Sequence, residues 1–260
     1  MASQLKLGHL INRSSKLVSL RYSSYLAPKP TLSYRPALCR PIINNKMRLV
    51  TISNSIKDAL TKSEVVPTVI HSDSFTPKGF LIISYGQDKE VAMGNTLAVK
   101  DTQQKPDFAF TLNLSKDTDP DFSISSSDRF TLVLTDPDAP TKGDEKWSEF
   151  CHYVVKNIKL NDFDPNKSVD VSQIEEQLTT TNLNGEALVP YMGPAPPPKT
   201  GKHRYVFLLY KQKPGVEPEA PADRPCWGTG VPGWGAEEWS QKNELQLLAV
   251  NFFYAQNEEQ

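Results

Sequence analysis

Three polar side chains stand where apolar runs of sequence meet loops rich in proline and glycine. Asp136 follows the run Phe130-Thr-Leu-Val-Leu-Thr135 and is itself followed by Pro-Asp-Ala-Pro. His203 ends a loop of Pro and Gly residues and begins a second apolar run, and His152 begins a third between them. Prolines fix φ beside rigid strands, so polar side chains at these junctions are held in place at low entropic cost. The pattern predicts a small polar pocket at the end of a sheet.

Two imidazoles and one carboxylate that converged in such a pocket would bind a small anion. Ring N–H groups donate hydrogen bonds to the anion's oxygens, while the carboxylate sets the tautomer and orientation of a ring. The same set, Asp136, His152 and His203, also resembles a two-histidine, one-carboxylate metal site, which holds iron or zinc and keeps positions open for chemistry. Metal ligands normally need supporting hydrogen bonds from further side chains, and the sequence identifies none. We therefore prefer the anion pocket and expect no metal, no cofactor and no catalytic residue.

Two neighbouring charged residues are more ambiguous. Asp138 is flanked by prolines and either joins the pocket or braces its loop through the backbone. Arg204 alternates with His203 and Tyr205 along a strand, so its side chain points to the opposite face. We keep Asp138 among the candidate ligand-binding residues and expect Arg204 to form an ion pair or to bond loop carbonyls.

The elements that must position these residues are mostly strands. Apolar and aromatic runs separated by Pro, Gly, Asp and Asn turns predict antiparallel sheets packed as a sandwich with a few peripheral helices. The spacing of Leu49, Ile52, Ile56 and Leu60 predicts one helix that ends before Pro67. A second helix, near the C-terminus, is predicted over residues 236–243. Strands are predicted over residues 79–85, 108–112, 130–134, 152–158, 203–210 and 247–254.

Charge is distributed unevenly along the 260 residues. Ten of the 29 Lys and Arg residues lie between Met1 and Lys57, a stretch without any acid, so the remainder carries 19 basic and 30 acidic residues. A body with a net charge of −11 repels phosphate backbones, which argues against nucleic-acid binding. No apolar run approaches the roughly 20 residues of a membrane-spanning helix.

Residues 1–46 form a basic, Ser-rich extension with the composition of a mitochondrial transit segment. Leu7, Ile11 and Val18 fall on one side of a helical wheel, with basic residues opposite. A disordered basic tail is the alternative. Initiation at Met47 would yield a cytoplasmic form that contains the whole predicted domain, residues 47–260. We therefore predict a mitochondrial location for the full-length chain and a cytoplasmic one for the shorter form.

Cysteine usage fits a reducing compartment. Cys39, Cys151 and Cys226 lie far apart and include no Cys-x-x-Cys pair, so a disulfide framework is not expected. Cys151 adjoins a candidate site residue, but free cysteines are usually buried and behave as small hydrophobes. We expect that role here rather than a reactive thiol.

Three of these motifs together resemble one protein family. Asp136-Pro-Asp-Ala-Pro140, a downstream His152 and Gly201-Lys-His-Arg-Tyr-Val206 occur in the order seen in phosphatidylethanolamine-binding proteins, which include the Raf kinase inhibitor proteins. The resemblance runs from about Met47 to the C-terminus and implies a Greek-key β-sandwich. It also implies that Asp136, His152 and His203 share a pocket for phosphate or a phospholipid head group, with Pro196, Pro197 and Tyr205 on its wall.

Four further stretches look like the branch of this family that inhibits carboxypeptidase: Val91–Leu97, Lys146–His152, Tyr191–Pro197 and Asn251–Ala255. The resemblance implies a non-enzymatic inhibitor that occupies the cleft of a serine carboxypeptidase, with a further role in Ras or kinase signalling through protein contacts. Phe150, Cys151 and Ala195 depart from the animal pattern, and the helix that closes the pocket in animal proteins is missing after Tyr254. These departures predict a more open pocket that fits a protein partner at least as well as a lipid.

Two other functions remain open at this point. A structural role in the mitochondrial ribosome is one, because a ribosomal protein there shares the domain. A metal-dependent enzyme that uses the Asp136, His152 and His203 triad is the other.

Overall fold

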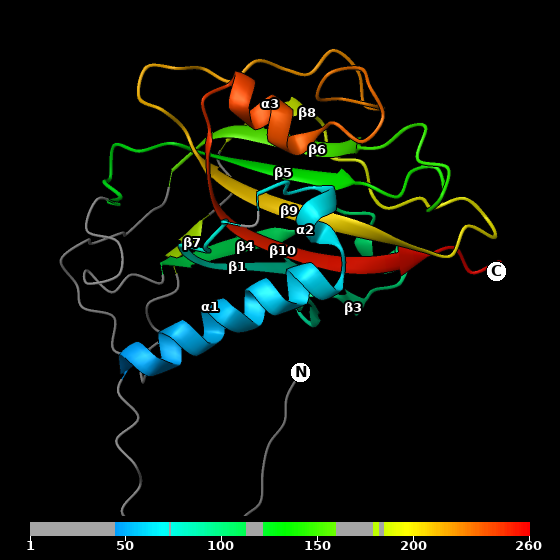
Figure 1. The fold of residues 1–260 in the computed structure, drawn as a ribbon, viewed down its shortest axis with the longest axis horizontal. Coiled ribbons are helices and arrows are strands. Elements are labelled where there is room, and N and C mark those ends of the chain that lie inside the picture. Colours follow the sequence, from blue (N-terminus) through cyan, green and yellow to red (C-terminus); the bar gives the residue numbers. More distant parts are fainter. Residues whose placement is uncertain (1–44, 73, 113–121, 160–178, 182–184) are drawn as a thin grey trace, which may run out of the picture. The chain divides into compact units, whose positions relative to one another are not determined.

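The computed structural model describes residues 45–72, 74–112, 122–159, 179–181 and 185–260. Residues 1–44 of the basic extension lie outside this part, so the transit segment and the domain boundary at Met47 stay predictions. Within the described residues the chain builds two β-sheets with helices on one side (Figure 1). None of the described helices has the length and apolar character of a membrane span.

The helices and the strands follow one another in a mixed order along the chain. The helices are α1 (Asn45–Lys62), α2 (Val65–Thr68), the 3-10 turn η1 (Val99–Thr102) and α3 (Ala236–Lys242). The strands are β1 (Gly79–Tyr85), β2 (Lys89–Val91), β3 (Asn95–Thr96), β4 (Asp107–Leu112), β5 (Phe130–Asp136), β6 (Phe150–Ile158), β7 (Thr179–Thr181), β8 (Glu186–Val189), β9 (Lys202–Lys211) and β10 (Gln246–Gln256).

The two sheets form a sandwich, as predicted. One sheet has the strand order β2-β1-β4-β7 and the other β3-β10-β9-β5-β6-β8. All strand pairs are antiparallel except that of β10 with the two-residue strand β3. The six predicted strands and both predicted helices are confirmed. The shorter strands β2, β3, β7 and β8 were not predicted, because two to four residues cannot display an alternating pattern.

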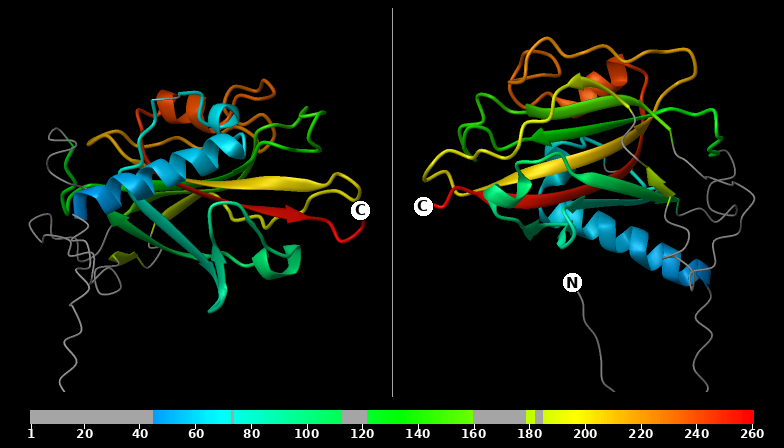
Figure 2. Two further views of the ribbon diagram at one scale, coloured as in Figure 1. Left: turned by 60° about the horizontal axis from the view of Figure 1, so that its bottom comes forward. Right: turned by 180° about the vertical axis from the view of Figure 1, so that it is seen from behind.

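The six-stranded sheet is covered on both faces. Its inner face packs against the four-stranded sheet through aromatic and aliphatic side chains such as Phe110, Phe207 and Phe253. Its outer face packs against the helices through Leu60, Leu208 and Trp239, among others. A turned view shows α1, α2 and α3 on one side of this sheet and the four-stranded sheet on the other (Figure 2, left).

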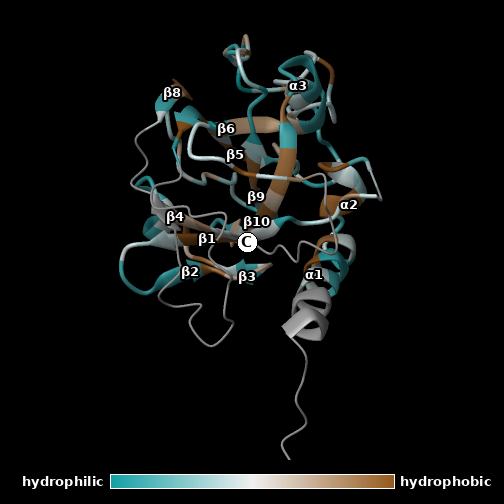
Figure 3. Cartoon of the chain, turned by 90° about the vertical axis from the view of Figure 1, so that its left-hand side faces the viewer, coloured by the Kyte–Doolittle hydropathy of each residue, from teal (hydrophilic) through white to brown (hydrophobic). Residues whose placement is uncertain are grey.

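Strand β9 lies at the centre of this arrangement. Each residue from His203 to Tyr210 is buried, because both faces of the strand are covered and its neighbours β5 and β10 pair with it on either side. Strongly hydrophobic colouring accordingly runs along parts of β9 and β10 (Figure 3). A strand this rigid positions the polar residues at its beginning, His203 and Arg204, one toward each face.

Candidate functional site

A hollow of about 150 Å³ lies where β9 begins and β5 ends. Apolar cavities of about this size take up a benzene-sized molecule, whereas sites for drug-sized ligands reach roughly 300 Å³ or more. The hollow therefore has room for a small molecule or a small anion. Its lining consists of Asp136, Ala139, Pro140, Trp147, Phe150, His152, Met192, Ala195, Pro196, Pro197, His203 and Tyr205.

Six of the seven residues predicted from the sequence lie in this lining: Asp136, His152, Pro196, Pro197, His203 and Tyr205. They come from three strands and one proline-rich loop that are distant in sequence. The seventh, Asp138, does not line the hollow, because its carboxylate is turned to the other side of β9.

His203 is fixed by hydrogen bonds at both ring nitrogens. Its Nδ1 lies 2.8 Å from Oδ2 of Asp136, and its Nε2 lies 3.0 Å from Oγ1 of Thr200. The Thr200 hydroxyl donates its single hydrogen to the carbonyl of Pro197, at 2.7 Å. Because a hydroxyl has one hydrogen to give, Thr200 accepts from the ring of His203. Asp136 and His203 thus form a buried hydrogen-bonded pair, and both nitrogens of the ring are engaged within the protein.

His152 is held differently. Its Nδ1 donates to the carbonyl of Met192 at 2.8 Å, and its ring packs edge-on against Tyr205. Burial lowers the pKa of His152 from the ordinary 6.5, against the opposing effect of Asp136. The ring is therefore neutral at pH 7. Among the described residues its Nε2 atom has no hydrogen-bond partner, so this nitrogen is left as an acceptor for a ligand.

The other polar groups that line the hollow are the carboxyl of Asp136 and the phenol of Tyr205. Oδ1 of Asp136 accepts from the backbone N–H of Asp138 at 2.7 Å. Burial, reinforced by Asp136, raises the pKa of Tyr205, so its phenol stays protonated. The sequence suggested that two imidazoles would donate to an anion, whereas here three of the four ring nitrogens are occupied within the protein.

The loop that carries Pro196 and Pro197 is anchored through its carbonyl groups. Prolines offer no N–H for strand pairing, so other groups of the protein must satisfy the loop's carbonyls. Asn257 donates to the carbonyl of Pro196 at 3.1 Å, and Gln103 donates to that of Pro194 at 2.9 Å. These bonds fix one wall of the hollow to the residues directly after strand β10 and the turn η1.

Two exposed apolar side chains form the rim. Trp147 is 45% and Met192 is 42% exposed, although both line the hollow. Neither residue was predicted to be part of the site, and neither were Ala139 and Pro140. Trp147 and Met192 do lie within the stretches that resemble carboxypeptidase inhibitors, which was the one available signal.

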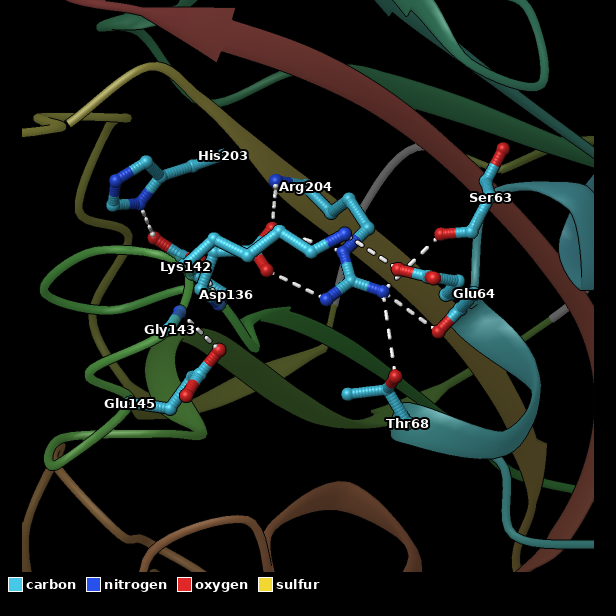
Figure 4. A network of polar contacts seen from close by, with 10 residues as sticks. Ser63, Glu64, Thr68, Asp136, Lys142, Gly143, Glu145, His203 and Arg204 are labelled. Atoms are coloured by element: carbon cyan, nitrogen blue, oxygen red, sulfur yellow. Dashed lines mark hydrogen bonds and ion pairs between the residues drawn. The ribbon is translucent and has the colours of Figure 1, made fainter.

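Asp138 instead forms a buried ion pair with Arg204 on the outer face of the sheet. Its Oδ1 accepts from Nη2 at 2.6 Å, and its Oδ2 accepts from Nε at 2.9 Å. Nη1 of Arg204 donates to the carbonyl of Glu64 at 2.6 Å and to that of Ser63 (Figure 4). The pair predicted for Arg204 is thus present, and it connects the end of α1 to β9.

Two alternatives raised by the sequence are a metal site at Asp136, His152 and His203 and a reactive thiol at Cys151. Within the described part of the chain, no group of three His, Cys, Asp or Glu side chains is placed to hold a metal ion. Both nitrogens of His203 already bond protein atoms. Cys151 is fully buried, as predicted, and burial raises the pKa of its thiol to about 12.

Comparison with known proteins identifies the family. The sequence profile described as phosphatidylethanolamine-binding protein matches residues 86–253. The carboxypeptidase Y inhibitor of Saccharomyces cerevisiae is 44% identical over 207 residues, which are 76% of this chain and 94% of that protein. A crystal structure of a carboxypeptidase Y inhibitor complexed with its cognate proteinase has 42% sequence identity and a TM-score of 0.69, and the match covers 79% of this chain and 97% of the other.

A more distant structure shares the fold. A phosphatidylethanolamine-binding protein from Plasmodium vivax has 21% identity and a TM-score of 0.58, with 78% of this chain and 97% of that chain covered. The sandwich predicted from the sequence is thus of this family's type. On both sequence and structure, the chain belongs to the phosphatidylethanolamine-binding protein family.

Proposed function

We propose that this protein is a non-enzymatic binding protein that inhibits a serine carboxypeptidase. The observation that carries the proposal is the 44% identity with the yeast carboxypeptidase Y inhibitor across 94% of that protein. The solved complex of such an inhibitor with its proteinase, which matches this chain at a TM-score of 0.69, adds support. Contacts with Ras-pathway regulators remain a prediction from the family resemblance.

A steric mechanism fits the fold. The sandwich is rigid, and α1 begins at Asn45 and ends at Lys62, beside the carbonyls that Arg204 binds. A helix clamped at its C-terminal end presents the segment near Met47 in a limited range of directions. Preorganisation of this kind reduces the entropy lost when a protease cleft is occupied.

The basic extension should weaken inhibition if the segment near Met47 enters the protease. We expect a form that begins at Met47 to inhibit yeast carboxypeptidase Y about tenfold more strongly than the 260-residue chain, a difference of about 1.4 kcal/mol. Inhibition constants from hydrolysis of a peptide substrate would measure this. Equal constants would contradict the dependence on the extension, and failure of both forms to inhibit at micromolar concentration would contradict the proposed function.

We further propose that the hollow binds the phosphoryl part of a phospholipid head group. Both ring nitrogens of His203 are engaged by Asp136 and Thr200, so His152 is the imidazole left to bind an anion. Because the pKa of His152 is lowered from 6.5 by burial, the ring is neutral at pH 7 and gains a charged N–H donor as the pH falls. A bound anion favours that protonated form.

Head-group affinity should therefore rise as the pH falls. Glycerophosphoethanolamine is a suitable ligand because its phosphodiester keeps one negative charge across this range. We expect its affinity to increase about tenfold from pH 7.5 to pH 5.5, measured by calorimetry. His152→Gln should abolish the pH dependence, whereas His71→Gln, which alters a histidine outside the hollow, should retain it. A pH-independent affinity in the unmodified protein would rule out His152 as the titrating group.

A further inference from the structure

A second cavity, of about 230 Å³, lies between α3 and the segment that follows α2. It reaches β9 at Tyr210, whereas the hollow described above lies at His203. Seven residues of strand separate these positions, which at about 3.3 Å per residue is roughly 23 Å. The two cavities are therefore independent sites at opposite ends of the same strand.

The wall of this cavity is apolar. Val69 and Ile70 are buried, and Phe75, Leu245 and Leu247 are partly exposed and pack at the edge of the outer core cluster. Partly exposed aromatic and aliphatic groups that face one cavity favour an apolar ligand, because contact removes their surface from water.

The polar edge of the cavity offers hydrogen-bond acceptors. Glu237 is a carboxylate that accepts from the backbone N–H of His71 at 2.5 Å and from Gln241 at 3.2 Å. Four lone-pair sites on a carboxylate leave it capacity for further donors. Ser240 already donates its hydroxyl hydrogen to the carbonyl of Glu237 at 2.8 Å, so toward a ligand it also accepts.

The surrounding charge is negative. Glu238 lies next to Glu237 on α3, and its Oε2 is buried without a hydrogen-bond partner among the described residues. In that part of the chain, His71 is the basic group paired with these carboxylates, with Nδ1 at 3.1 Å from Oε1 of Glu238 and 4.0 Å from Oε2 of Glu237. Burial raises the pKa of Tyr210, so its phenol adds no further charge. Two carboxylates thus face one imidazole.

We propose that this cavity binds a small organic amine, with an apolar body and a protonated amino group. The body would lie against Phe75, Leu245 and Leu247, and the ammonium would donate to Glu237 and Ser240. The negative charge of Glu237 favours an ammonium, so an alcohol binds less well and a carboxylate is repelled. An apolar cavity of about 150 Å³ accommodates benzene, so 230 Å³ has room for a phenyl ring with a two-carbon aminoalkyl arm.

Three ligands of similar shape test the proposal on the full chain. 2-Phenylethylamine, 2-phenylethanol and phenylacetate differ in charge but share a phenyl ring and a short arm. Titrations followed by amide chemical shifts at pH 7 should give the amine a Kd on the order of 1 mM, as for other fragment-sized ligands, with shifts at Ser72, Ser240 and Leu247. We expect the alcohol to bind about tenfold more weakly and the carboxylate not to bind.

Variants of the lining residues test the contribution of charge to ligand binding separately from that of cavity shape. Glu237→Gln should reduce the tenfold preference for the amine over the alcohol to about twofold, because it removes the charge and retains an amide oxygen for His71. Leu247→Trp should fill the cavity and weaken both ligands, and Glu258→Gln, an exposed control, should change neither. Equal affinities for the three ligands, or shifts confined to residues around His203, would overturn the proposal. Carboxypeptidase inhibition is a separate measurement, so either result can fail alone.

Discussion

Replacing Asp138 by alanine should lower the free energy of unfolding by about 3–5 kcal/mol, the cost typical of leaving one charge of a buried pair without its partner. The side chain of Arg204 is 5% exposed and that of Asp138 is 1% exposed. Two guanidinium donors and the backbone N–H of Arg204, which lies 2.7 Å from Oδ2 of Asp138, would lose their acceptor. Urea denaturation of the full chain would measure the change.

A double variant distinguishes the buried charge from simple loss of packing. Asp138→Ala combined with Arg204→Met leaves no unpaired charge, so it should recover part of the stability that Asp138→Ala loses. Lys142→Ala, which breaks the solvent-exposed pair with Glu64, serves as the control and should have no measurable effect. A double variant less stable than the single one would show that the cost does not arise from an isolated guanidinium.

The single variant Asp138→Ala should also loosen α1. Arg204 holds the carbonyls of Ser63 and Glu64 only while its guanidinium is oriented by Asp138. Hydrogen exchange of the α1 amides should therefore accelerate in Asp138→Ala more than exchange in β9, which is paired on both sides. If the segment near Met47 enters a protease, this loss of order should also weaken inhibition.

Asp136 and Asp138 show how one short loop serves two faces of a sheet. Their partners, His203 and Arg204, are consecutive on β9 and so point to opposite sides of it. Oδ1 of Asp136 binds the N–H of Asp138, which fixes the loop between them. The strand alternation was visible in the sequence and correctly placed Arg204 away from the hollow. The same alternation did not show that the carboxylate of Asp138 would pair with Arg204 on the outer face rather than join His203 at the hollow.

The long strands were predictable because their residues form apolar and aromatic runs over five or more positions. The edge strands were not, and neither were the residues that loops bring to the hollow from outside the strands. Trp147 lies in the loop before β6, and Met192 lies in the proline-rich segment after β8. The course of these segments depends on tertiary hydrogen bonds, such as that from the N–H of Met192 to the carbonyl of His152. Nothing in a local pattern specifies such a contact.

Glu149 is a second residue that the sequence did not single out. It is fully buried, its Oε1 accepts from the N–H of Ala236 at 3.0 Å, and its Oε2 has no hydrogen-bond partner among the described residues. Gly235 makes room for it, since a Cβ there would lie 2.6 Å from atoms of the Glu149 side chain. Burial raises the pKa of Glu149 from 4.5 to about 8, with Glu238 and Glu237 adding to the effect. Glu149 is therefore protonated in the folded protein at neutral pH.

This raised pKa should make the protein less stable as the pH rises. Below about pH 4.5 the carboxyl is protonated in both the folded and the unfolded chain, so it does not change the free energy of unfolding. Between pH 4.5 and pH 8 the unfolded chain gains by ionising Glu149 while the folded chain keeps it neutral, and the free energy of unfolding falls. A tenfold change in proton affinity is worth about 1.4 kcal/mol, so the total loss is on the order of 5 kcal/mol.

Comparison with Glu149→Gln isolates this contribution from other titrating groups, including His152. The amide cannot ionise, so the difference in unfolding free energy between the variant and the unmodified protein should shift in the variant's favour by on the order of 4 kcal/mol between pH 5 and pH 8.5. Urea denaturation at a series of pH values gives both curves. Glu258→Gln, which changes an exposed carboxylate, should run parallel to the unmodified protein. If the curve for Glu149→Gln also runs parallel, Glu149 is ionised in the folded state, and water or a cation must then reach Oε2.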